Sequence, residues 1–393
     1  MPLAYLHGVE VQEIQTGDRP IRTVKSSIIG IVGTAPDADA AKFPLNTPVL
    51  VTGSRLEAAG LDTVGNGLGT LPDMLDGIFD QAGAMVVVIR VAEGVDAAET
   101  QSNVIGGVDA GTGEYTGVHA LLASEGTVHA IPRILIAPGF TDQAAVVTEM
   151  LAIADRLRAV IIADGPNTND ADAIAYRDGF GSARVYVVDP QVKVWDTVAD
   201  AEVSQVASAR VAGLIARSDA ERGFWWSPSN QELYGIVGTH RPVDFSLGDV
   251  NARANHLNEN EVATIIHKDG YRLWGNRTCS SDPKWAFLSV RRTADMINES
   301  LQVAHMWAVD RNITKTYLED VVEGVNAYMN HLKNQGAIIN GKAWADPELN
   351  TPDQISQGIV YIDFDFTPPY PAEHIVFRSQ LTNDYLVEVL PAA

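Results

Sequence analysis

The stretch that decides the fold runs from residue 133 to residue 190 and contains three short apolar runs: RILIAPG (133–139), AVIIADGP (159–166) and ARVYVVDP (183–190). Each run is rich in aliphatic residues and ends in Pro or Gly, which is typical of a buried strand followed by a turn. The intervening and following sequence predicts helices over about 143–157, 169–179 and 203–218. Apolar strands that alternate with helices predict a parallel, doubly wound sheet, so the middle of the chain is expected to be α/β.

On both sides of this stretch the pattern changes. Towards the N-terminus, strands are predicted over 27–33, 48–52 and 84–91 and a helix over 71–81, after a capping pattern that starts a short helix at Ser54. Towards the C-terminus, helices are predicted over 282–309 and 315–334, and strands over 260–267, 272–274 and 359–366. The chain as a whole is therefore expected to be mixed α/β and α+β, with several parts. We expect these borders: an N-terminal arm (1–22), a first core part (23–95), an inserted α/β domain (96–255), a C-terminal core domain (256–370) and a C-terminal strand arm (371–393).

The composition excludes several classes of protein. The 393 residues carry 28 basic and 50 acidic side chains, a formal net charge of −22, which argues against a nucleic-acid-binding surface. Cys279 is the single cysteine, so an intrachain disulfide and a cysteine-based zinc cluster are both ruled out. No apolar run approaches the length needed to cross a bilayer, and the first residues lack the blocks of a secretory signal. We expect a protein that is made and kept in a cytoplasm, without direct membrane insertion.

The search for a catalytic or cofactor site yields only weak candidates. The glycine-rich stretch GNGLGT (65–70) resembles a dinucleotide fingerprint loosely, but Thr70 stands where the third glycine belongs, so a turn is favoured. Asp164 and Asp189 lie where parallel strands are predicted to end, the usual place for ligands in open α/β sheets. Each is followed by Gly-Pro or Pro, which favours a tight turn. We therefore expect no catalytic residue, no metal and no cofactor, and keep an enzyme acting near Asp164 or Asp189 as an alternative.

Basic residues gather in one short region of this acidic chain. Two readings are open: the side chains pair with acidic groups of their own chain, or they dock against the acidic surface of an adjacent copy. The six members of this candidate docking patch are Lys268, Arg272, Arg277, Lys284, Arg291 and Arg292.

The two ends of the chain are predicted to be extended. The segment 5–14 has strand character and is separated from the body by the turn-forming 16–20, while the Pro-rich 367–371 precedes strands over 374–379 and 385–390. Terminal strands behind flexible linkers suit strand addition, in which main-chain hydrogen bonds join neighbouring copies. The candidate inter-subunit residues are Tyr5, Val9, Val11, Tyr385, Val387 and Val389.

Four stretches resemble the tail sheath proteins of contractile-tailed phages and R-type pyocins: PLAYLHGVEV (2–11), GYRLWGNRT (270–278), the Trp285 to Arg292 region, and PAEHIVF (371–377). The run 270–278 is the most specific of them. The resemblance covers essentially the whole chain and is weaker in the middle.

The resemblance implies a structural subunit whose arms add strands to sheets of neighbouring subunits. These subunits form a helical sleeve of stacked rings around a tail tube, and the sleeve contracts to push the tube through a cell envelope. It implies a virion tail location and contacts with tube, baseplate and tail terminator proteins, and places the inserted domain (96–255) outward, with a subtilisin-like fold that lacks protease activity. A non-contractile virion structural protein remains a further alternative.

Overall fold

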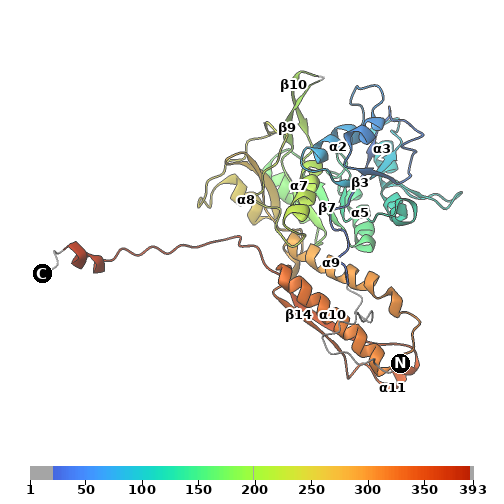
Figure 1. The fold of residues 1–393 in the computed structure, drawn as a ribbon. Coiled ribbons are helices and arrows are strands. Elements are labelled where there is room, and N and C mark those ends of the chain that lie inside the picture. Colours follow the sequence, from blue (N-terminus) through green and yellow to red (C-terminus); the bar gives the residue numbers. More distant parts are fainter. Residues whose placement is uncertain (1–20, 198, 390–393) are drawn as a thin grey trace, which may run out of the picture.

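The computed structural model describes residues 21–197 and 199–389, and its largest element is an eight-stranded sheet (Figure 1). The strand order is β13-β12-β8-β7-β6-β1-β3-β2. All neighbouring pairs from β12 to β3 are parallel, while β13 and β2 are antiparallel strands at the two edges. The strands are β1 (Ile29–Thr34), β2 (Val49–Thr52), β3 (Met85–Val91), β6 (Ile134–Ile136), β7 (Val160–Asp164), β8 (Val185–Val188), β12 (Val262–His267) and β13 (Tyr271–Trp274).

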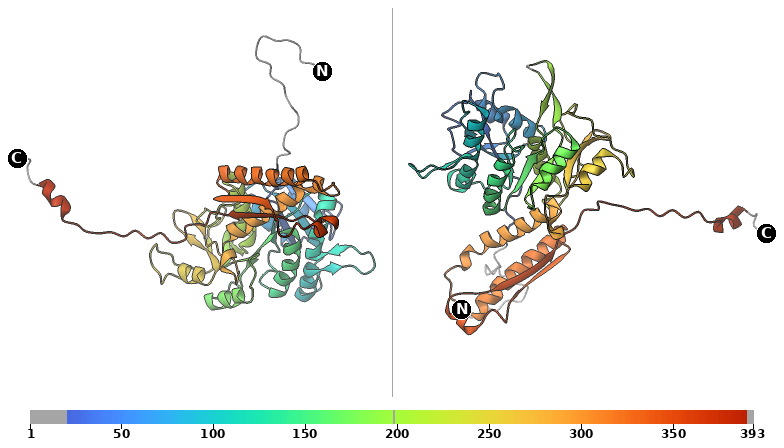
Figure 2. Two further views of the ribbon diagram at one scale, coloured as in Figure 1. Left: turned by 90° about the horizontal axis from the view of Figure 1, so that it is seen from below. Right: turned by 180° about the vertical axis from the view of Figure 1, so that it is seen from behind.

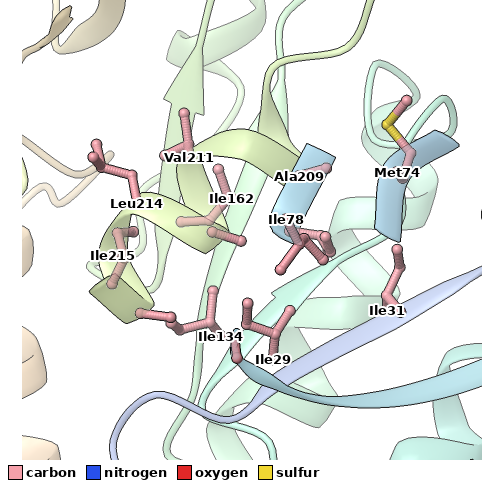
Figure 3. Packing of buried hydrophobic residues seen from close by; sticks show 14 of the residues in the cluster. Ile29, Ile31, Met74, Ile78, Ile134, Ile162, Ala209, Val211, Leu214 and Ile215 are labelled. Carbon is pink, nitrogen blue, oxygen red and sulfur yellow. The ribbon is translucent and has the colours of Figure 1, made fainter. Parts of the chain in front are cut away.

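Helices cover both faces of the sheet, because successive strand side chains point to opposite sides and both sides are apolar. Ile29 and Ile31 of β1 face α2 (Leu71–Phe79) and α7 (Ser208–Glu221), as Figure 3 shows. Val32 of the same strand belongs to the core on the other side. That side is covered by α3 (Ala97–Ile105), the 3-10 helix η2 (Gly117–Ala123) and α5 (Ala144–Leu157). The prediction of a doubly wound, mostly parallel sheet is confirmed.

The sheet draws its strands from three of the predicted segments. β1 to β3 come from 23–95, β6 to β8 from 96–255, and β12 and β13 from 256–370. The parallel pairings of β1 with β6 and of β8 with β12 carry the sheet across the expected borders at 95/96 and 255/256. These three segments therefore contribute to one sheet, and both faces of its parallel part are buried.

Smaller elements decorate this body. The predicted helix over 203–218 begins instead at Ser208, because Ala201–Gln205 pairs with a preceding strand that the sequence did not reveal. Ser54 caps its helix as predicted, accepting a hydrogen bond from the backbone of Glu57. The smaller elements of the body are α1 (Arg55–Ala58), η1 (Ala59–Leu61), β4 (Gly107–Val108), β5 (Tyr115–Thr116), α4 (Ser124–Val128), α6 (Asp170–Asp178), β9 (Val192–Asp196), β10 (Ala201–Gln205), β11 (Gly238–Thr239) and α8 (Arg253–Glu259).

A second, smaller unit lies against one end of the body (Figures 1 and 2). Its two long helices are α9 (Leu288–Ala304) and α10 (Lys315–Gln335), and the antiparallel hairpin of β14 (Asn340–Ala345) and β15 (Ile362–Thr367) packs on α10. The helix predicted over 282–309 is shorter than expected, since 3-10 turns precede and follow α9. These turns are η3 (Pro283–Trp285) and η4 (Met306–Ala308). The short helix α11 (Pro352–Ser356) is part of the connection that leads from β14 to β15.

The apolar stripe of α10 forms the core of this unit. Val321, Val325, Met329 and Leu332 are buried, as their helical spacing predicts. They pack with residues of α9 and of the hairpin, and with Phe224, which follows α7 of the body. The smaller unit therefore has a core of its own that also joins it to the body.

The C-terminal segment runs away from the folded part of the chain (Figures 1 and 2). The strands predicted over 374–379 and 385–390 are not formed in the single chain: residues 374–382 have no regular structure, and a 3-10 helix, η5, spans Asp384–Val389. A strand needs a neighbouring strand to pair its backbone groups, and none lies beside this segment in the described part of the chain. The predicted N-terminal strand, with Tyr5, Val9 and Val11, lies outside the described residues.

None of the helices in residues 21–197 and 199–389 combines the length and apolar character that a membrane span requires.

Candidate functional site

The carboxyl end of β1 is where an open α/β sheet would place a ligand, because β1 lies between β3 and β6 and the connections depart in opposite directions. Here that edge is covered by the glycine-rich loop 65–70. Thr34 and Thr70 exchange two hydrogen bonds, from the Thr34 N–H to the Thr70 Oγ1 (3.1 Å) and from the Thr70 N–H to the Thr34 carbonyl (2.9 Å). Gly69 has φ 92°, and a Cβ there would lie 2.4 Å from the Thr34 oxygen. The loop thus packs its backbone directly against the end of the strand.

Asp164, the first of the two candidate carboxylates, is buried at the end of β7. It accepts hydrogen bonds from the Ser208 N–H (2.8 Å) and Oγ (2.6 Å) and from the Thr141 Oγ1 (3.2 Å). Burial raises its pKa to about 6, and the hydrogen bonds from Ser208 and Thr141 oppose that rise. The carboxylate lies at the end of β7 and accepts hydrogen bonds from Ser208, the first residue of α7. It therefore caps this helix and ties it to the sheet.

Asp189, the second candidate, is also buried and is held by Arg241 and by the backbone of Asn167 (2.8 Å). Burial raises its pKa, while the guanidinium of Arg241 acts in the opposite direction. Arg241 also pairs with Asp170 at the start of α6. In the described residues no three His, Cys, Asp or Glu side chains are grouped closely enough to hold a metal ion. Both candidate aspartates therefore fasten loops and helices to the carboxyl edge of the sheet.

The six basic residues of the candidate docking patch do not share one environment. Arg292 is buried against Asp219, Arg291 pairs with Asp295, and Arg277 pairs with Glu373. Arg272 donates to the backbone carbonyls of Lys268 and Asn230. Lys268 and Lys284 are exposed, and neither forms an ion pair with another residue of the described ranges. The reading in which basic groups pair with their own chain therefore accounts for three of the six.

One face of α9 carries a set of charges that the sequence analysis missed. Asp295 accepts from Arg184 (2.8 Å) and Arg291 (2.7 Å), while Glu299 pairs with Arg133 (2.9 Å). Arg133 and Arg184 immediately precede β6 and β8, so α9 lies along the amino edge of the parallel sheet. The signal was present in the sequence as an arginine near the start of two predicted strands, but its acidic partner could not be assigned without the fold.

Arg292 and Asp219 form the most buried of these contacts, with side chains that are 4% and 3% exposed. The guanidinium donates twice to the carboxylate, at 2.8 and 2.5 Å, and once to the Ser26 carbonyl at 3.2 Å. The Ser26 Oγ donates to the same carboxylate at 2.6 Å. This cluster joins α9, α7 and the segment that leads into β1.

The hairpin and the C-terminal segment together present a different kind of site. Within the described residues β14 pairs with β15 alone, so each strand leaves one edge without a partner. The C-terminal segment exposes large apolar side chains: Ile375 is 65%, Phe377 93% and Leu381 97% exposed. Tyr385, one of the predicted inter-subunit residues, is 70% exposed. Exposed apolar side chains on an extended chain mark a segment that another surface is suited to bury.

Three family models match successive parts of the chain. They are the "Tail sheath protein Gp18 domain III N-terminal region" over residues 26–91, the "Phage tail sheath protein central domain" over 113–279 and the "Phage tail sheath C-terminal domain" over 280–382.

Curated relatives match over the full length. A prophage major tail sheath protein of Pseudomonas aeruginosa is 48% identical, with 100% of both chains covered. The tail sheath protein of Escherichia phage P2 is 40% identical, with 98% of both chains covered.

Solved structures share the fold. The helical sheath of the anti-feeding prophage in its contracted state matches with a TM-score of 0.71 and 21% identity, covering 97% of this chain and 100% of that one. The contracted sheath complex of an extracellular contractile injection system matches with a TM-score of 0.69 and 17% identity, covering 98% and 100%.

The family models and the full-length relatives place this protein among the structural components of phage-type tails. The chain belongs to the phage tail sheath protein family, as the full-length relatives at 40% and 48% identity show.

Proposed function

We propose that this protein polymerises helically around a tail tube, through strands donated by its terminal segments, and contracts to drive the tube through a target cell envelope. The observation that carries the proposal is the C-terminal segment of this tail sheath family member. It runs away from the folded part of the chain and exposes Ile375, Phe377 and Leu381. Residues 374–381 have no regular structure and are all exposed in the described chain, and such apolar side chains on an irregular segment suit burial against another surface.

Strand addition supplies the link between copies. An extended segment that pairs with a sheet edge gains main-chain hydrogen bonds, and its alternate side chains enter the core beneath the sheet. The hairpin of β14 and β15 offers such edges over the apolar core built on α10. Ile375, Phe377 and Leu381 fall on one face of an extended chain, since their position numbers are all odd and successive side chains point to opposite faces. That face suits burial in the acceptor's core.

Head-to-tail links of this kind produce a helix when the rotation does not close a ring. Contraction then requires two packings of the same copies, separated by a free-energy difference and a barrier. A similar fold occurs in sheath complexes described in the contracted state and in the baseplate of the anti-feeding prophage. Tube, baseplate and tail terminator proteins are accordingly the partners we propose, with assembly in the host cytoplasm.

The proposal assigns no chemical step to the chain. Asp164 and Asp189 are the strongest catalytic candidates, and each is buried and hydrogen-bonded to groups that hold the fold together. Mechanical work would come from repacking between copies, and no bond would be made or broken.

Deletion of residues 374–393 tests the proposal, with electron microscopy of the protein expressed alone as the readout. The full chain is expected to form tubes with helical striations. The truncated chain is expected to keep its circular dichroism spectrum and thermal midpoint but to stay monomeric, because the apolar core clusters of the described residues include none from position 374 onward. Deletion of residues 1–20 is expected to act in the same way. A truncated chain that still forms tubes would refute strand donation by that end.

A further inference from the structure

The C-terminal segment is fastened to the body before it leaves the molecule. After β15 the chain passes Pro368, which is buried, and Pro369 and Pro371, which are half-buried. Prolines restrict the backbone, so this stretch is stiff. The last fastened residue is Glu373, and every residue from 374 to 381 is exposed. The free part of the segment therefore begins directly after Glu373.

Glu373 is held by Arg277, which lies in the run 270–278. The Arg277 Nε donates to both carboxylate oxygens (2.9 and 3.1 Å) and Nη2 donates to one of them (2.6 Å). The guanidinium also lies over the ring of Phe287, 5.1 Å from its centre, and that ring meets Tyr370 edge-on at 6.2 Å. A planar guanidinium with several bonds to one carboxylate restricts direction as well as distance.

The body side of this contact is rigid. Asn276 and Thr278 on either side of Arg277 are buried. The Thr278 N–H donates to the Ala286 carbonyl (2.7 Å) and the Asn276 carbonyl accepts from Leu288 (2.9 Å). Arg277 is thus presented from a fixed backbone, at the junction between the large sheet and α9. In Figures 1 and 2 the segment departs beside this junction.

We propose that Arg277 and Glu373 form a latch that fixes the exit direction of the C-terminal segment and so determines where a second copy can be joined. The inference rests on the proposed function, because direction matters only if the segment pairs with another copy. A segment held at its root searches a smaller volume than a free one, which raises the effective concentration of its end at the acceptor. The latch is a positioning device, since neither residue needs to touch the neighbouring copy.

Charge reversal tests the latch. Three variants are compared with the full chain: Arg277→Glu, Glu373→Arg and the double exchange. Lys193→Glu changes the charge as Arg277→Glu does, at an exposed pair with Glu202 on the body, and serves as the control. Sedimentation measures the lowest protein concentration at which polymer forms. Each single reversal is expected to raise it at least fivefold, which corresponds to about 1 kcal/mol per link, while the double exchange and the control are expected to stay within twofold.

A second measurement follows the exit direction without polymer. Spin labels are attached at Glu259→Cys on α8 and at Ser379→Cys on the segment, and the distribution of distances between the two labels is measured in dilute protein. The native Cys279 is buried and therefore does not take up label. Arg277→Glu is expected to broaden the distribution, and the double exchange is expected to narrow it again. An unchanged distribution, or single reversals that assemble within twofold of the full chain, would overturn the latch.

The deletion of residues 374–393 separates the two proposals. If the truncated chain assembles like the full chain, strand donation by this end is refuted together with the latch. If the truncated chain fails to assemble but the single reversals assemble normally, the segment is needed and the latch alone is refuted.

Discussion

Replacement of Arg292 by Ala is the sharpest test of how the chain is held together. The Arg292 guanidinium makes two hydrogen bonds to Asp219 and one to the Ser26 carbonyl, and both charged side chains are at most 4% exposed. Without Arg292 the Asp219 carboxylate stays buried with the Ser26 hydroxyl as its remaining side-chain donor. Removing one partner of a buried ion pair costs about 3–5 kcal/mol, because the other charge loses its compensation.

Arg277→Ala provides the comparison. Its pair with Glu373 has a similar number of hydrogen bonds, but the two side chains are 36% and 45% exposed. Water solvates the Glu373 charge when Arg277 is removed, so a loss of at most about 1 kcal/mol is expected. The difference between the two variants isolates the effect of burial.

Urea denaturation of dilute protein, below the concentration at which polymer forms, gives the free energy of unfolding of each variant. The double variant Asp219→Leu with Arg292→Met is expected to recover most of the loss, since apolar side chains of similar size need no compensating charge. The reasoning is refuted if Arg292→Ala costs no more than Arg277→Ala. It is refuted equally if the double variant is as unstable as the single one.

Further outcomes follow from individual buried groups. Burial raises the pKa of Asp164 to about 6, above an unfolded value of about 3.9, so the folded state binds this proton more tightly. The free energy of unfolding should then fall by about 3 kcal/mol as the pH rises from about 3 to about 7. Asp164→Asn should flatten that slope in urea titrations at each pH. Cys279 is fully buried, and desolvation raises the pKa of its thiol to about 12. A disulfide reagent should therefore react with it only after unfolding. Rapid reaction of the native protein with the reagent would contradict this packing. Gly33→Ala would bring a Cβ to 2.3 Å from the Thr70 Oγ1 and should cost about 1–3 kcal/mol in the same denaturation assay, whereas Gly126→Ala, with open space around it, should leave stability unchanged or slightly raised.

Much of the body could be read from local pattern. The runs at 133–139, 159–166 and 183–190 are apolar on both faces, and such strands are stable only between two layers of helices, as β6, β7 and β8 are. The Ser54 cap and the apolar stripe of α10 are likewise local features, set by spacing within a few residues. The resemblance of 270–278 to sheath proteins agrees with the family shown by the full-length relatives.

The tertiary structure alone determined the strand order and the ion pairs, because both join residues that lie far apart in the sequence. The strand order, with β12 beside β8 and β1 beside β6, determines that one sheet crosses the expected segment borders. It also brings Arg292 to Asp219 and Arg277 to Glu373, so two members of the candidate docking patch form ion pairs within the chain, which is one of the two readings left open by the sequence. The strands predicted near the C-terminus are not formed in the single chain, although their sequence favours extension. Local sequence sets a backbone preference, but a strand or an ion pair exists only where the fold, or a second copy, supplies the complementary group.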